Sequence, residues 1–208
     1  MLATHESDLA YVVAGDGESL QGPSGRLRVD VGLLHAKVAA GAEHPLIRAL
    51  GPVRRVLDGT LGMAQDALHI AAVTGAVVEG AEASPWVAQL VSAGLRGLEG
   101  SRWSDAAGRI RVHAMPSVEL ASRVEPVDAV FCAPMFETPA RAAPGFPLFR
   151  EVADPRPLDD ATFDAFLRIG RRLVVRVEKG APPPRPGMLA VPGKAVDYWV
   201  CGCVDGQV

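Results

Sequence analysis

Residues 56–67, Val-Leu-Asp-Gly-Thr-Leu-Gly-Met-Ala-Gln-Asp-Ala, decide the fold of this 208-residue chain. An apolar run leads into Asp58, glycines follow at positions 59 and 62, and a helical pattern then continues to Gly75. Glycine suits the left-handed position that ends many helices. At the carboxyl end of a parallel strand, such a turn brings backbone N–H groups and the next helix N-terminus close to a ligand. The segment therefore predicts a strand, a ligand-binding turn and a helix over 63–74.

Two carboxylates indicate which kind of ligand this turn would hold. Asp58 stands at the mouth of the turn, where the G-x-G-x-x-G fingerprint of dinucleotide sites places a pyrophosphate. A carboxylate repels a phosphate but attracts an ammonium group, such as the aminoacyl end of S-adenosylmethionine. Glu82 follows 24 positions later at the end of the apolar run AVVEGA, where a carboxylate can accept both ribose hydroxyls. The pair favours S-adenosylmethionine over NAD, so a nicotinamide oxidoreductase is the weaker alternative.

Alternating strand and helix patterns predict an α/β fold with a parallel sheet covered by helices on both faces. The helix that starts at Ser84 and Pro85 has a good N-cap and a good first residue, and helices are also expected over 45–50 and 63–74. Residues 133–158 contain six prolines and are predicted to form a long loop. A β-hairpin annex is expected over 11–34. The strands of the main sheet are expected at about 53–57, 76–81, 109–113, 127–132, 172–177 and 196–203.

Composition narrows the classes of protein that the sequence can encode. About half of the residues are apolar, the mean hydropathy is +0.17 and the net charge is −3, which indicates a globular chain without a broad basic surface for nucleic acid. Basic residues do gather between 171 and 194, so a local patch stays open. The acidic N-terminus and the lack of a long apolar run predict a soluble, cytoplasmic protein.

The three cysteines predict neither a disulfide framework nor a metal site. Cys201 and Cys203 stand two apart in an expected strand, with no second Cys or His pair near them in sequence, so buried thiols are favoured. Cys132 precedes the segment Ala133-Pro134-Met135 and is expected to be inert packing.

Beyond these patterns, the sequence resembles a known family over about four-fifths of its length. The likeness runs from LRVDVGLLHAKV and HPLIRALG through VLDGTLGMAQDALHIAAVTGAVVEGAEASPWVAQLVSAGL and DAVFCAPMF to DPRPL, RRLVVRVEKGAPP and VDYWV. These segments are similar to class I methyltransferases grouped with the small-subunit rRNA guanine-N2 methyltransferases. The resemblance implies a Rossmann-like domain over 45–208, an N-terminal hairpin extension over 1–44, S-adenosylmethionine as cofactor and no metal.

The resemblance also assigns candidate site residues, by their positions in this chain. The expected cofactor contacts are Asp58, Gly59, Thr60, Gly62, Asp66, Glu82, Ala83, Ser84 and Ala114. The expected catalytic segment is Ala133, Pro134, Met135 and Phe136, and the expected acceptor contacts are His35, Lys37, Glu137 and Tyr198.

One departure from the family pattern concerns the chemistry itself. The family tetrapeptide is Asp-Pro-Met-Phe, whereas this chain has Ala133 in the first position, so the acceptor for the hydrogens of an amine is lost. A polar contact of that kind is commonly worth about 3 kcal/mol in the transition state. Three hypotheses remain: rRNA methylation with a substitute acceptor such as Glu137 or Asp154, methylation of a small molecule or peptide, or a catalytically silent cofactor-binding protein or scaffold. A homodimer is also expected.

Overall fold

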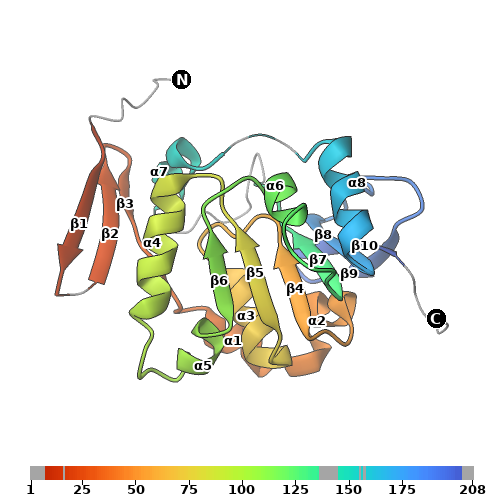
Figure 1. Ribbon diagram of the computed structural model, residues 1–208. Coiled ribbons are helices and arrows are strands. Elements are labelled where there is room, and N and C mark those ends of the chain that lie inside the picture. The colour runs from red at the N-terminus through yellow and green to blue at the C-terminus, as the bar shows by residue number, and fades with distance from the viewer. Residues whose placement is uncertain (1–7, 16, 136–144, 155, 157, 203–208) are drawn as a thin grey trace.

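The computed structural model describes residues 8–15, 17–135, 145–154, 156 and 158–202. A central sheet has seven strands in the order β6-β5-β4-β7-β8-β10-β9, and a separate sheet of three strands lies beside helix α4 (Figure 1). The central strands are β4 (Arg55–Asp58), β5 (Val77–Ala81), β6 (Ile110–His113), β7 (Ala129–Cys132), β8 (Arg172–Glu178), β9 (Leu189–Pro192) and β10 (Val196–Gly202). The α/β class expected from the sequence is confirmed.

The sheet is parallel from β6 to β8, but its last two strands run against this direction. Strand β10 pairs antiparallel with both β8 and β9, so the expectation of a wholly parallel sheet was wrong at this edge, and β9 was not predicted. Only residues 193–195 connect β9 to β10. Because a parallel pair needs a long crossover connection, usually helical, so short a return places β10 antiparallel to β9.

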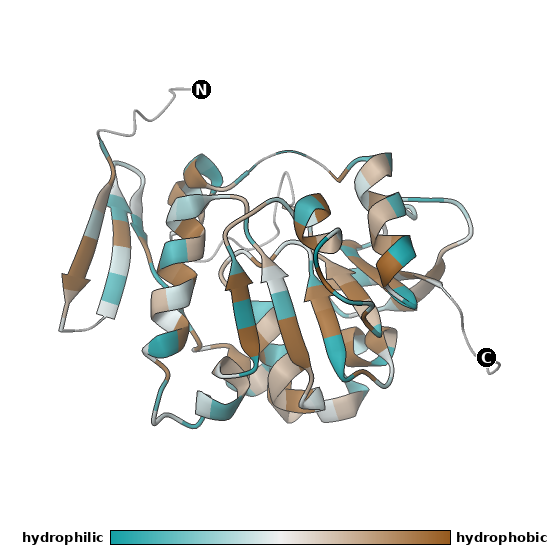
Figure 2. Cartoon of the chain, viewed as in Figure 1, coloured by the Kyte–Doolittle hydropathy of each residue, from teal (hydrophilic) through white to brown (hydrophobic). Residues whose placement is uncertain are grey.

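Helices cover both faces of the sheet, as predicted. On one face, α2, α3, α4 and α5 contribute to an apolar cluster around Val56, Val78 and Phe131. On the other face, α6 and α8 pack around Leu57, Val130 and Leu173. Figure 2 shows the apolar strand residues between these layers. The helices are α1 (Leu34–Ala39), α2 (Pro45–Leu50), α3 (Gln65–Thr74), α4 (Pro85–Arg96), α5 (Ser104–Ala107), α6 (Ser117–Ala121), α7 (Phe146–Val152) and α8 (Asp160–Ile169), with a 3₁₀ turn η2 at Gly41–Glu43.

Two helix boundaries follow from local sequence signals. Helix α4 starts where Ser84 caps it, with the Ser84 Oγ accepting from Val87 N at 3.4 Å and Pro85 in the first turn. Helix α3 ends at Gly75, whose φ of +72° is the expected left-handed conformation. It begins two residues later than predicted because Ala64 takes a left-handed φ of +57° before it.

The expected loop over 133–158 contains a helix. Helix α7 covers Phe146–Val152, so the prediction of continuous loop was wrong there. Its only internal proline, Pro147, lies in the first turn, where a missing N–H breaks no helical hydrogen bond. Leu148 of this helix is fully buried against Leu20 and Leu90, which anchors α7 beside the three-stranded sheet.

The N-terminal annex is a meander of three strands rather than a hairpin. Its strands β1 (Ala10–Ala14), β2 (Gly17–Gly22) and β3 (Gly25–Leu27) pair antiparallel in sequence order. Strand β2 packs against α4, as Figure 1 shows. The division between 1–44 and 45–208 stays a prediction.

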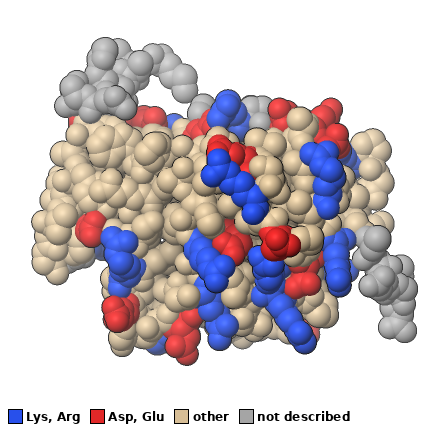
Figure 3. All heavy atoms as spheres, viewed as in Figure 1, with Lys and Arg blue, Asp and Glu red and all other residues tan. Residues whose placement is uncertain are grey.

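Charged side chains of both signs are interspersed over the face seen in Figure 3. In the basic segment near the C-terminus, Lys179 pairs with Asp197 at 2.6 Å and Arg185 pairs with Asp160 at 2.7 Å. Among the described residues, no helix has the length and apolar character needed to cross a membrane. Cys132 is buried and Cys201 half-buried, both as free thiols, while Cys203 lies outside the described residues.

Replacement of Gly94 by Ala tests how tightly the annex docks on α4. A Cβ at Gly94 would lie 2.3 Å from Cγ2 and 2.5 Å from Cβ of Val29, a stiff β-branched side chain. Overpacking costs about 1–3 kcal/mol, and an overlap this close to a stiff side chain falls in the upper part of that range, which leaves a net loss of about 1–2 kcal/mol after the gain of about 1 kcal/mol in helix propensity. We expect the melting temperature to fall by about 2–8 °C in calorimetry. Gly97→Ala, where the nearest atom would be 3.4 Å away, is the matched control. A Gly94→Ala variant as stable as the parent would contradict this packing.

Candidate functional site

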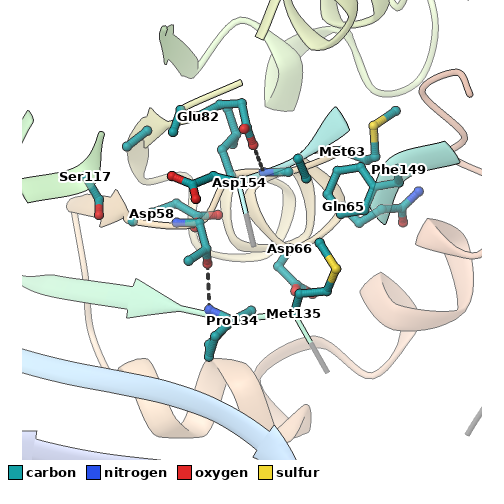
Figure 4. A pocket seen from close by; sticks show the side chains of 18 of the residues that line it. Asp58, Met63, Gln65, Asp66, Glu82, Ser117, Pro134, Met135, Phe149 and Asp154 are labelled. Carbon is teal, nitrogen blue, oxygen red and sulfur yellow. Dashed lines mark hydrogen bonds between the residues drawn. The ribbon is translucent and has the colours of Figure 1, made fainter. Parts of the chain in front are cut away.

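A pocket of about 690 Å³ lies where β4, β5 and β7 end (Figure 4). Its walls come from the turn after β4, the residues that follow β5 and β7, helix α7 and the start of α1. Parallel strands present their carboxyl ends at one edge of the sheet, which is where α/β proteins bind ligands. The turn at Asp58–Gly62 therefore forms part of the wall of this pocket.

Asp58, the last residue of β4, is buried in the wall of this pocket with 1% of its surface exposed. Its Oδ1 accepts a hydrogen bond from the backbone N–H of Thr60 at 3.0 Å, which closes the first part of the turn. Burial raises the pKa of Asp58 to about 7, although the Thr60 N–H opposes the shift. The carboxyl group is thus placed to pair with a cation that enters the pocket.

Glu82 joins the turn after β4 to the start of α4. Its Oε2 accepts from Gly62 N at 3.1 Å, and its Oε1 accepts from Ser84 N at 2.9 Å. Burial raises the pKa of Glu82, while these backbone N–H groups oppose the shift. Each carboxylate oxygen has a second lone pair, so the side chain can still accept bonds from a ligand hydroxyl.

Gly62 adopts a left-handed φ of +50°, a conformation that glycine takes without strain. A Cβ at this position would lie 3.3 Å from the ring of Phe149 on α7. The aromatic ring therefore packs closely on the glycine turn and forms the wall of the pocket opposite the sheet.

Thr60 connects the turn to the segment expected to be catalytic. Its Oγ1 accepts from the backbone N–H of Ala133 at 2.6 Å (Figure 4). The next residue, Pro134, has no N–H. The two residues nearest the end of β7 therefore offer carbonyl oxygens but no N–H donor to a ligand.

Asp66, in the first turn of α3, forms ion pairs with two basic side chains that also line the pocket. Its Oδ1 lies 3.0 Å from Lys37 Nζ, and its Oδ2 pairs with Arg176 Nη1. Burial by itself would raise the pKa of Asp66, but Arg176 and Lys37 hold it well below its usual range. Asp66, expected from the resemblance to contact the cofactor, is thus already engaged by protein cations.

The structure brings most of the predicted site residues into one cavity. The pocket lining includes Lys37, Asp58, Gly59, Thr60, Gly62, Asp66, Glu82, Ala83, Ala133, Pro134 and Met135.

Four predicted residues lie outside that lining, and two are not described. Ser84 caps α4 and donates its N–H to Glu82, Tyr198 is buried in the core, and His35 is exposed on α1. Ala114 follows β6 without lining the pocket. Phe136 and Glu137 lie outside the described residues. The roles given to all of these residues stay predictions.

Several wall residues were not predicted from the sequence, and segments distant in the chain supply most of them. The additional lining residues include Arg28, Asp30, Leu33, Met63, Gln65, Pro116, Ser117, Phe149, Arg156 and Arg176. Met63 and Gln65 flank positions that were identified, so adjacency could have found them. Arg176 lies on β8, and only three-dimensional structure brings it to Asp66. Asp154, expected as a substitute acceptor for the hydrogens of the amine, does line the pocket and pairs with Arg156.

Comparison with known proteins gives matches at the level of family and fold. Residues 30–145 match the family model described as "Putative SAM-dependent methyltransferase". A SAM-dependent methyltransferase from Neisseria gonorrhoeae aligns with a TM-score of 0.74 and 21% identity, over 98% of this chain and 86% of that chain. The 16S rRNA N2-guanine methyltransferase RsmC of T. thermophilus, in complex with AdoMet and guanosine, aligns with a TM-score of 0.54 and 15% identity. That alignment covers 93% of this chain and 50% of RsmC. No curated protein sequence matches the chain.

Replacing Asp58 with Asn should stabilise the ligand-free protein at high pH. A folded pKa of about 7, above the unfolded value, means that folding favours the protonated acid and that stability falls as pH rises through this range. Asn keeps an oxygen for the Thr60 N–H but never ionises. We expect a gain of about 2–4 kcal/mol at pH 8 that shrinks toward pH 4, measured by denaturant unfolding at each pH. A gain independent of pH, or a loss at pH 8, would contradict the assigned pKa.

Proposed function

Because the chain belongs to the family of SAM-dependent methyltransferases, we propose that its pocket holds S-adenosylmethionine between Asp58 and Glu82 and delivers the methyl group to an amine nitrogen beside Ala133. The cofactor supplies an electrophilic methyl group on a sulfonium ion. The chain's residues supply the binding, the orientation and the exclusion of water. The proposal rests on one observation above all, the two buried carboxylates that line one pocket at adjacent strand ends.

The residues present fit this cofactor. Asp58 is a buried carboxyl group whose ionised form would gain a partner from the ammonium of the cofactor. Glu82 has two oxygens with remaining acceptor capacity for the ribose hydroxyls. Gly62 keeps the wall between them free of a side chain, and Phe149 closes the opposite side. The cavity therefore has an anionic end, a hydroxyl-accepting end and an apolar cover.

The donors and acceptors at the end of β7 favour an amine as the methyl acceptor. The N–H of Ala133 is occupied by Thr60 and Pro134 has none, so this segment can only accept hydrogen bonds. An amine with N–H donors matches such a surface and would be turned with its lone pair toward the methyl group. The backbone thus retains part of the role that the missing Asp side chain would have played.

An RNA guanine amine is the first acceptor to test. The fold is shared with RsmC, a 16S rRNA N2-guanine methyltransferase, and the sequence resemblance points to the same class. A small molecule or peptide amine is the second candidate. It is favoured by Ala133, by the net charge of −3 and by the mixture of charges on the face in Figure 3. A silent cofactor-binding protein, the cytoplasmic location and the homodimer stay predictions.

The cofactor contact of Asp58 can be measured directly. We expect Asp58→Asn to weaken binding of S-adenosylhomocysteine about 10- to 100-fold in calorimetry, because a buried charge-assisted hydrogen bond to the ammonium is lost. Asp105→Asn, at an exposed position of helix α5, makes the same chemical change away from the pocket and should bind as the parent does. Equal affinity in the Asp58 variant and the parent would count against the site.

Restoring the family carboxylate distinguishes the acceptor classes. Ala133 lines the pocket, so the added side chain of Ala133→Asp would face the cavity. With deproteinised small-subunit rRNA as substrate, we expect the rate of guanine-N2 methylation to rise about 100-fold over the parent. Ala133→Leu adds similar bulk without an acceptor and should show no gain. An Asp variant that binds S-adenosylhomocysteine but gains no activity on this RNA would contradict the RNA acceptor and favour a smaller amine.

A further inference from the structure

Two basic side chains converge on one acid inside the pocket. Lys37 comes from α1, Arg176 from the middle of β8 and Asp66 from the first turn of α3, so three elements far apart in sequence meet at this point. All three residues line the cavity. The side chains of Lys37 and Arg176 keep 31% and 27% of their surface exposed, against 13% for Asp66. The group, called the Asp66 cluster below, faces the pocket through its cations.

The Asp66 cluster carries an excess positive charge. Because the pKa of Asp66 is held well below its usual range, the carboxylate is ionised at neutral pH and contributes one negative charge. Lys37 and Arg176 contribute two positive charges. Among these three side chains the positive charges thus exceed the negative charge by one, and Lys37 contributes one of these two cations, both of which line the cavity.

Lys37 also has hydrogen-bonding capacity to spare. An ammonium group has three N–H donors. In the described part of the chain, the hydrogen bond assigned to Lys37 Nζ is the one to Asp66 Oδ1. A cation in a low-dielectric cavity is stabilised most by an anion that joins it directly. The pocket thus has a negative pole at Asp58 and a positive pole at the Asp66 cluster.

We propose that Lys37, positioned by Asp66, is an anion contact of the pocket and binds a carboxylate or phosphate group of a ligand. The inference rests on the proposed function, because it concerns the same cavity. Two sources can supply the anion: the α-carboxylate of the cofactor, whose ammonium lies at Asp58, or an acidic group on the methyl acceptor. Asp66 is then a positioning residue that orients the lysine rather than a ligand contact.

The test uses the full-length protein and three probes. S-adenosylhomocysteine has the amino-acid end with its carboxylate, methylthioadenosine lacks that end, and inorganic phosphate represents an acidic group on the acceptor. Affinities for the two nucleosides are measured by calorimetry. The effect of phosphate is measured as the rise in melting temperature of the protein already saturated with S-adenosylhomocysteine.

Lys37→Met removes the charge and keeps the length of the side chain, while Lys37→Arg restores the charge. Lys194→Met is the matched control, since Lys194 is exposed and does not line the pocket. If the cofactor carboxylate is the anion, Lys37→Met should lower the affinity for S-adenosylhomocysteine about 10- to 100-fold and leave the affinity for methylthioadenosine unchanged. Lys37→Arg should restore the affinity for S-adenosylhomocysteine. Removal of a cation cannot weaken the hold on an ammonium, so this loss would belong to the carboxylate.

If the acceptor supplies the anion, both nucleosides should bind Lys37→Met as they bind the parent. The stabilisation by phosphate should then be lost in that variant and kept in Lys37→Arg and Lys194→Met. An equal loss of affinity for both nucleosides, or no change in any of the three readouts, would overturn the proposal. The ion pair between Lys37 and Asp66 would then have a purely structural role. If the parent bound no S-adenosylhomocysteine, the cofactor site would fail instead, and phosphate added to the ligand-free protein would decide the inference about Lys37 by itself.

Discussion

The carboxylate of Glu82 holds together the two chain segments on which the pocket depends. One oxygen accepts from Gly62 N at 3.1 Å and the other from Ser84 N at 2.9 Å, so the turn after β4 and the start of α4 are fixed to the same side chain. Hydrogen bonds to an ionised acceptor are about twice as strong as neutral ones. This contact holds the left-handed turn at Gly62 beside the end of β5, and Asp58, the last residue of β4, lines the same cavity as Glu82.

The three acids of the pocket illustrate how surroundings, rather than residue type, set protonation. Burial raises the pKa of Asp58 to about 7 and also raises that of Glu82. Asp66 is buried too, but two cations hold its pKa well below the usual range. A ligand can therefore supply charged or hydroxyl partners to Asp58 and Glu82, whereas Asp66 is already paired with Lys37 and Arg176. Perturbed carboxyl groups of the first kind are typical of binding and catalytic sites.

The parts of the structure that were predicted depend on local signals. The turn after Asp58, the cap at Ser84 and the end of α3 at Gly75 can each be recognised within a few residues, because capping and left-handed positions have narrow residue preferences. The helix at Phe146–Val152 was missed since prolines surround it, although one of them falls where a helix tolerates it. The pairing of Arg176 with Asp66 is a long-range contact, which no local pattern encodes.

The N-terminal part of the chain, like the central sheet, supplies residues that line the pocket. Leu27 at the end of the annex, the residues that follow it and Lys37 on α1 contribute side chains to the cavity wall, and Leu33 remains largely exposed there. An exposed apolar side chain at a pocket mouth gains burial only when a ligand covers it. Lys37 meanwhile ties α1 to α3 through Asp66. Whatever division is made near residue 44, the wall of the cavity comes from both parts of the chain. Under the function proposed above, changes between Leu27 and Lys37 would therefore alter the contacts to the acceptor without altering Asp58 or Glu82.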